Sequence, residues 1–185
     1  MLDKKIETAL NSQLELEAYS SFSYLAMAVW CDQKSLDGCS RFFYRQSEEE
    51  HLHMMKIVHY MIERNGNPVI PAIKTPKSNF KDINEIFQST YEQEKKVSLS
   101  IHELINMAQK LNDHSTQNFL QWYVAEQREE EAMMRTVLDR IKLIGDGPQS
   151  LYFIDKEIEA LNQAAQAAEA AGGKAEEVEY AAKTK

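Results

Sequence analysis

The sequence predicts an all-α protein, a four-helix bundle with one long crossover loop and a short fifth helix. Four long segments place apolar side chains at alternating three- and four-residue spacing, the period of a face buried between packed helices. The six glycines and four prolines, which interrupt helices, fall almost wholly between these segments. No stretch shows the alternation expected of a β-strand. The chain of 185 residues is long enough for one domain with a sizeable core.

The first two helices are predicted to form an antiparallel hairpin. The first spans about residues 3–34, where its apolar stripe is continuous. Asp37 is the expected N-cap of the second, because an Asp side chain accepts hydrogen bonds from the free N–H groups there. Residues 65–68, Asn-Gly-Asn-Pro, are a stop signal that ends the second helix.

A second antiparallel hairpin is predicted from the third and fourth helices. Asp82 followed by Glu85 resembles a capping box and opens the third helix. This helix ends near Leu111, and either Asp113 or Ser115 caps the fourth. The connection between the two helices is short, so they must pack side by side.

The C-terminal part of the sequence predicts one more helix and a tail. Glycines and a proline within residues 145–148 end the fourth helix, and a shorter amphipathic helix begins near Gln149. An Ala-rich stretch then leads to a mixed-charge end that has no apolar face to dock. We therefore divide the chain into a domain of residues 1–162 and a mobile tail of residues 163–185.

The segment of residues 66–81 determines how the two hairpins are joined. Its three prolines favour an extended path, and about fifteen extended residues reach ~50 Å. A helix of about 28 residues is only ~42 Å long. The segment can therefore run the full length of the bundle as a single crossover.

Polar residues interrupt the middle of every apolar stripe. An unpaired buried carboxylate costs several kcal/mol or gives up its charge, so carboxylates that converge in a core indicate a bound cation. The interrupting residues are Glu17 in the first helix, Glu50 and His53 in the second, Glu94 in the third, and Gln127 and Glu130 in the fourth.

These residue types suit a pair of bridged metal ions. Oxygen ligands with one imidazole favour iron or manganese over metals that prefer thiolates. Gln127 stands where a symmetric site would have a Glu, and its neutral amide should hold one metal loosely. Additional acids lie beside the site, which suggests that the metal moves on from it; they include Glu49, Glu126 and Glu129.

At these residues the chain resembles the bacterial non-haem ferritins over about residues 1–162. The resemblance rests on four stretches in order: LELEAYSSFSYLAM around Glu17, SEEEHLHMMK around Glu50, FLQWYVAEQREEE around Gln127, and LYFIDKE in the last helix. It implies the ferritin-like bundle fold and storage of iron. It also implies a ferroxidase that oxidises Fe²⁺ with dioxygen or peroxide and deposits a ferric mineral inside a hollow shell of 24 subunits.

The resemblance also assigns roles to individual residues. One iron would be held by Glu17, Glu50 and His53, and the other by Glu50, Glu94 and Glu130 with Gln127 beside it. A third iron site would use Glu49, Glu126, Glu129 and Glu130. Tyr24 matches a tyrosine close to the centre that can supply an electron.

No haem is expected. The related bacterioferritins have a second Glu-x-x-His in the fourth helix and a methionine haem ligand immediately after the second-helix glutamate. In this chain that position is His51.

The composition of the chain indicates which cellular location and which binding partners to expect. The formal net charge is −8 and there is no basic run, so nucleic acid is not an expected partner. The two cysteines form no disulfide framework, and the charged N-terminus lacks the apolar core of a signal peptide. No apolar run is long enough to cross a bilayer. A soluble cytoplasmic protein is expected.

Three other interpretations remain open. A rubrerythrin-like di-iron oxidoreductase would reduce peroxide, but such proteins add a Cys-rich iron domain. A DNA-protecting miniferritin would place its metal site between subunits and would have no fifth helix. A purely structural bundle would leave the buried carboxylates unexplained.

Overall fold

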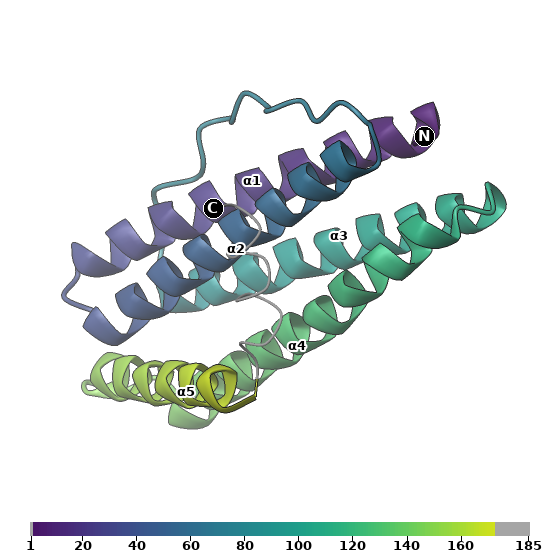
Figure 1. The fold of residues 1–185 in the computed structure, drawn as a ribbon. Coiled ribbons are helices and arrows are strands. Elements are labelled where there is room, and N and C mark those ends of the chain that lie inside the picture. The colour runs from purple at the N-terminus through teal and green to yellow at the C-terminus, as the bar shows by residue number, and fades with distance from the viewer. Residues whose placement is uncertain (1, 173–185) are drawn as a thin grey trace.

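The computed structural model describes residues 2–172, and all regular structure within that range is helical. Figure 1 shows four long helices packed as a bundle and a fifth across one end of it. The helices are α1 (Lys4–Asp32), α2 (Asp37–Glu63), α3 (Ile83–Lys110), α4 (His114–Ile144) and α5 (Ser150–Gly172). The predicted all-α class and helix order are confirmed.

Two antiparallel hairpins, α1–α2 and α3–α4, make up the bundle, and they face each other mainly through α1 and α3. The crossover between α2 and α3 runs along the outside of the first hairpin (Figure 1). Asn11 on α1 holds the start of this crossover by donating to the carbonyl of Asn67 at 3.1 Å and accepting from the amide of Val69 at 2.7 Å. The loop therefore follows the long path predicted from its length.

Three of the helices begin at an aspartate cap. Asp3, Asp82 and Asp113 each accept a hydrogen bond from a backbone amide in the first turn of their helix. The capping box at α3 differs from the prediction by one residue. The side chain of Glu85 accepts from the amide of Lys81, whereas a standard capping box would use the amide of the N-cap residue, Asp82. Between the two candidates for α4, the structure selects Asp113.

The predicted cap at Asp37 is wrong. The N-cap of α2 is Leu36, and no side chain at that position makes a capping hydrogen bond. The side chain of Asp155 on α5 takes the role of the cap instead, because it accepts a hydrogen bond from the amide of Cys39 at 2.9 Å. The sequence could not show this because the acceptor comes from a different helix.

A close approach between α5 and α2 makes that contact possible. A Cβ atom on Gly38 would lie 2.2 Å from the backbone oxygen of Asp155, so only glycine fits. Ile154 and Ile158 of α5 are buried against the bundle. The helix continues to Gly172, beyond the predicted boundary at residue 162. The rest of the predicted tail, residues 173–185, lies outside the described residues.

The core consists of two apolar clusters, one at each end of the bundle. The cluster near the α1–α2 turn includes Phe42, Phe43 and Phe87 and is closed by α5. The cluster at the opposite end includes Ile6, Ile57 and Leu120. Each of the four long helices passes from one cluster to the other through a short polar stretch, and these stretches together form a polar belt across the middle of the bundle.

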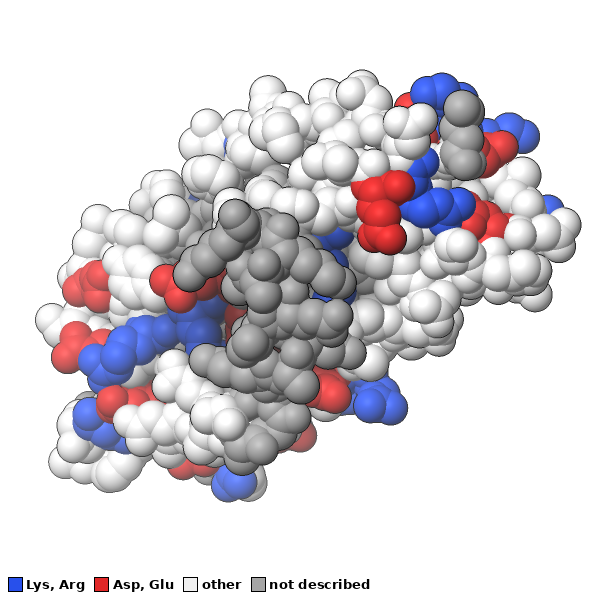
Figure 2. All heavy atoms as spheres, in the orientation of Figure 1, with Lys and Arg blue, Asp and Glu red and all other residues white. Residues whose placement is uncertain are grey.

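The surface is mixed in charge. On the face drawn in Figure 2, basic side chains lie among acidic ones and no broad basic surface is visible. Within the described part of the chain, no helix is both long enough and apolar enough to cross a membrane.

Candidate metal centre

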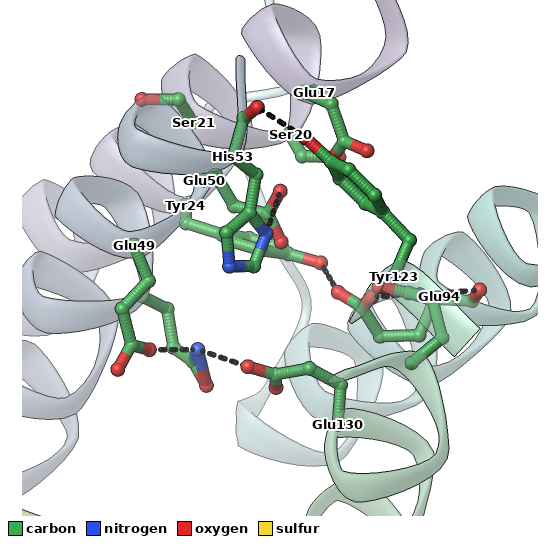
Figure 3. A network of polar contacts seen from close by, with 12 residues as sticks. Glu17, Ser20, Ser21, Tyr24, Glu49, Glu50, His53, Glu94, Tyr123 and Glu130 are labelled. Atoms are coloured by element: carbon green, nitrogen blue, oxygen red, sulfur yellow. Dashed lines mark hydrogen bonds and ion pairs between the residues drawn. The ribbon is translucent and has the colours of Figure 1, made fainter. Parts of the chain in front are cut away.

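The polar belt contains all six residues predicted to surround a metal pair, and each is almost fully removed from solvent. Their exposed fractions are 0% for Glu17, 1% for Glu50, 4% for His53, 1% for Glu94, 3% for Gln127 and 8% for Glu130. All four long helices contribute, because each stripe carries its polar residues midway along the helix. Figure 3 shows the side chains of Glu17, Glu50, His53, Glu94 and Glu130 meeting between the helices.

One half of the belt is formed by Glu17, Glu50 and His53. Each offers a ligand atom, and these atoms all lie within 4.8 Å of one another. Glu17 Oε2, Glu50 Oε2 and His53 Nδ1 are buried and have no hydrogen-bond partner. The Glu50 and His53 atoms are 3.6 Å apart, too far for a hydrogen bond. Three buried ligand groups that lie this close together, each with an atom that lacks a hydrogen-bond partner, match the coordination of a single cation.

The other half of the belt is formed by Glu94, Gln127 and Glu130, and its carboxylates already have partners. Tyr24 donates its hydroxyl to Glu94 Oε1, and Gln127 Nε2 donates to Glu94 Oε2 at 3.0 Å. Gln46 Nε2 donates to Glu130 Oε1 at 3.1 Å. Among the residues that the structure describes, these side chains are not part of a cluster of three His, Cys, Asp or Glu ligands as tight as the first.

Burial makes the ionised forms of these acids costly. It is the largest cause of the raised pKa of Glu17, Glu50, Glu94 and Glu130. Repulsion adds to this effect: Glu50 raises the pKa of Glu17, and Glu94 raises the pKa of both Glu50 and Glu130. For Glu94, the hydrogen bonds from Tyr24 and Gln127 act in the opposite direction. Cations in the belt would allow all four carboxylates to be charged.

The donor set fits iron. Carboxylate oxygens with one imidazole nitrogen are ligands that Fe²⁺ and Mn²⁺ accept, and no thiol lies in the belt to favour a softer metal. Glu50 stands between the two halves, since its carboxylate interacts with those of both Glu17 and Glu94.

Three further residues position the belt and were not singled out from the sequence. Gln13 donates to Glu17 Oε1 at 2.8 Å, and Tyr123 donates its hydroxyl to the carbonyl of His53 at 2.7 Å. Gln46 donates to two acids, one in the belt and one at its edge. All three lie on the apolar stripes that the sequence displays. A polar group on a buried stripe was therefore the signal that could have identified them.

The acids predicted for a third iron site lie at the edge of the belt. Glu49 and Glu126 are half-buried and close enough to raise the pKa of Glu130, after the larger effects of burial and Glu94. The side chain of Glu129 is 73% exposed and lies 3.8 Å from Arg128. The structure therefore brings two of these acids toward Glu130, whereas Glu129 points into solvent.

Tyr24 is fully buried next to the second half of the belt. Burial raises the pKa of its hydroxyl well above the usual value, and Glu94 raises it further. The side chain therefore stays protonated as a hydrogen-bond donor to Glu94. Its proposed part in electron supply stays a prediction.

The chain is similar in sequence to proteins of a known family. A family model described as "Ferritin-like domain" matches residues 7–144. The chain is 40% identical over 158 residues to a bacterial non-heme ferritin of Campylobacter jejuni, covering 85% of this chain and 95% of the relative. It is 37% identical over 162 residues to a bacterial non-heme ferritin of Escherichia coli, covering 88% and 98%.

A solved structure shares the fold. The open pore ferritin of the archaeon Archaeoglobus fulgidus superposes with a TM-score of 0.83 at 40% identity, covering 86% of this chain and 98% of that one. The family model, the sequence identities and the shared fold lead to the same result. The chain belongs to the ferritin-like domain family.

Proposed function

We propose that the protein is an iron-storage ferritin with ferroxidase activity. It oxidises Fe²⁺ with dioxygen or peroxide and stores the product as a hydrated ferric mineral inside a hollow homo-oligomeric shell, with 24 subunits as the expected number. The observation that carries the proposal is the close group of Glu17, Glu50 and His53, each with a buried ligand atom that has no hydrogen-bond partner. A structural bundle would gain nothing by leaving them without partners.

The chain's own residues bind and orient the substrate iron. Glu17 and His53 hold one ion, Glu94 and Glu130 hold the other, and Glu50 bridges the two. Gln13 fixes the carboxylate of Glu17, and Tyr123 fixes the helical segment that carries His53. Carboxyl groups with raised pKa values release protons as the cations arrive, so binding neutralises the site without leaving buried negative charge.

Reduction of one molecule of dioxygen to hydrogen peroxide, or of one hydrogen peroxide to water, requires two electrons. Two Fe²⁺ ions supply them as they become Fe³⁺, and with two protons they reduce dioxygen to hydrogen peroxide, or hydrogen peroxide to two water molecules. Tyr24, hydrogen-bonded to Glu94, would supply one electron for the reduction of the peroxide when only one further Fe²⁺ is available, and would be left as a tyrosyl radical. The neutral Gln127 leaves the second ion less tightly held, which favours passage of iron toward Glu49, Glu126 and Glu129.

The setting proposed is the cytoplasm, with no haem, nucleic acid or membrane partner. The test is aerobic Fe²⁺ loading of the purified protein, followed by measurement of particle mass and iron content. A closed shell that gains many more irons than its binding sites supports storage. A stable monomer or dimer at micromolar concentration, or iron uptake that stops at the ligand-bound equivalents, would overturn it.

A further inference from the structure

The amide of Gln46 lies between an acid of the centre and an acid outside it. Its nitrogen donates to Glu49 Oε2 at 2.6 Å and to Glu130 Oε1 at 3.1 Å. The two dashed lines between Glu49 and Glu130 in Figure 3 follow these hydrogen bonds. Gln46 therefore connects the second half of the belt directly with the edge of the belt.

The oxygen of the same amide has no partner. Gln46 is 2% exposed, and its Oε1 atom is buried without a hydrogen-bond donor. Turning the amide over would place that oxygen against two carboxylates, so the orientation seen is favoured as long as both carboxylates accept from the nitrogen. A buried carbonyl oxygen without a donor costs about 1–3 kcal/mol. It is also a ligand that a hard cation accepts.

The surroundings of Glu49 disfavour long residence of a cation there. Arg45 donates to Glu49 Oε1 and, through Nε, to Asn162 Oδ1 of α5 at 2.6 Å. A cation bound by Glu49 would lie close to this guanidinium and would be repelled by it. Such a position suits an ion in passage.

We infer that Gln46 is a transit ligand, which takes iron from Glu130 and passes it to Glu49 by presenting its amide oxygen. This inference rests on the proposed function, since it describes how iron leaves that same centre. When a cation approaches, the carboxylates of Glu130 and Glu49 turn to it and no longer accept from the amide. The amide can then rotate about its last torsion, which has a broad, roughly two-fold profile, and offer Oε1 to the ion.

The experiment counts Co²⁺ ions bound per subunit of the metal-free assembled protein, by calorimetry and visible absorption, so that no oxidation is involved. In the natural protein we expect one tight equivalent, a second that binds less tightly, and a third that is weaker still. Gln46→Leu should keep the first two and weaken the third by roughly tenfold to a hundredfold. Gln46→Glu, which keeps an oxygen at this position, should retain the third.

Gln13→Leu is the matched control. Gln13 is equally buried, donates to a belt glutamate and also has an unpartnered Oε1, but it contacts Glu17 on the other half of the belt. Because Gln13 positions Glu17, this variant should weaken the first equivalent, whereas the third should survive. Three results would overturn the inference: an unchanged third equivalent in Gln46→Leu, its loss in Gln46→Glu or Gln13→Leu, or an isotherm with only two equivalents in the natural protein. Absence of any tight Co²⁺ in the natural protein would instead refute the proposed function.

Discussion

The two halves of the polar belt have similar residues but different hydrogen bonding. In the half formed by Glu17, Glu50 and His53, three buried ligand atoms lack partners. In the half formed by Glu94, Gln127 and Glu130, donors from Tyr24, Gln127 and Gln46 already satisfy the carboxylates. A cation entering the first half finds ligand atoms without hydrogen bonds, whereas a cation entering the second must displace hydrogen bonds.

This difference in hydrogen bonding predicts which half of the belt binds its cation more tightly. A typical hydrogen bond contributes about 1 kcal/mol net, which corresponds to roughly a fivefold change in affinity. Two or three displaced hydrogen bonds therefore make the second position noticeably weaker. The comparison predicts that the first ion is retained and the second exchanges, and the following four variants test that ranking.

Glu50→Ala should have the largest effect, because it removes the one carboxylate that serves both halves. We expect fast Fe²⁺ oxidation to fall by on the order of a hundredfold, since even losing a residue that only supports a ligand costs 10–100-fold. Stopped-flow absorbance after mixing with Fe²⁺ measures this. Glu48→Ala, an exposed neighbour on α2, is the control and should oxidise normally. A natural rate in the Glu50 variant would mean that the centre lies elsewhere.

His53→Ala should damage the first half selectively. Without the imidazole, the tighter of the first two Co²⁺ equivalents should weaken by about tenfold or more, while the weaker one changes less. Calorimetric titration of the metal-free protein separates the two. His51→Ala, on the exposed side of the same helix, supplies the comparison. Equal weakening of both equivalents would contradict the division into halves.

Gln127→Glu should strengthen the second half by adding a negative charge beside two cations. It also removes the donor to Glu94 Oε2, which leaves that oxygen available for the metal. Ferric iron should stay longer at the centre, and recovery of fast oxidation between iron additions should slow by roughly tenfold, equivalent to about 1.4 kcal/mol. Mössbauer spectra locate the retained iron. Recovery as fast as in the natural protein would show that the neutral amide does not control release.

Tyr24→Phe should have the smallest effect on binding. Loss of the hydroxyl frees Glu94 Oε1, so the second Co²⁺ equivalent should bind about fivefold more tightly, equivalent to about 1 kcal/mol. If the tyrosine also supplies an electron, its radical signal should disappear from electron paramagnetic resonance spectra of the oxidising protein. Weaker binding of the second ion would show that Tyr24 positions Glu94 for the metal.

Local patterns in the sequence were sufficient to predict the helices and the composition of the belt. Glu17 and Glu94 stand on stripes whose period identifies them as buried, and carboxylates that converge in a core indicate a cation. The contrast between the two halves was not predictable. It depends on which donor each carboxylate meets across the bundle, as Glu94 meets Tyr24 and Glu130 meets Gln46.

The incorrect cap has a long-range origin. Asp37 follows a rule for local capping, but packing of α5 supplies Asp155 from a distant part of the chain. Helix α5 extends to Gly172 through an Ala-rich stretch whose residues favour helix. Ala-rich segments can continue a helix that is already anchored, as α5 is by Ile154 and Ile158.

The contact between Asp155 and the start of α2 has a consequence for the timing of folding on the ribosome. The acceptor follows the Cys39 amide by 116 residues. At a synthesis rate of about 5–20 residues per second, Asp155 is made roughly 6–23 s after Cys39. During that interval the first turn of α2 can fray, and the cluster of phenylalanines beneath it stays open at one end. The nascent chain therefore completes this end of its core only after α5 has been made.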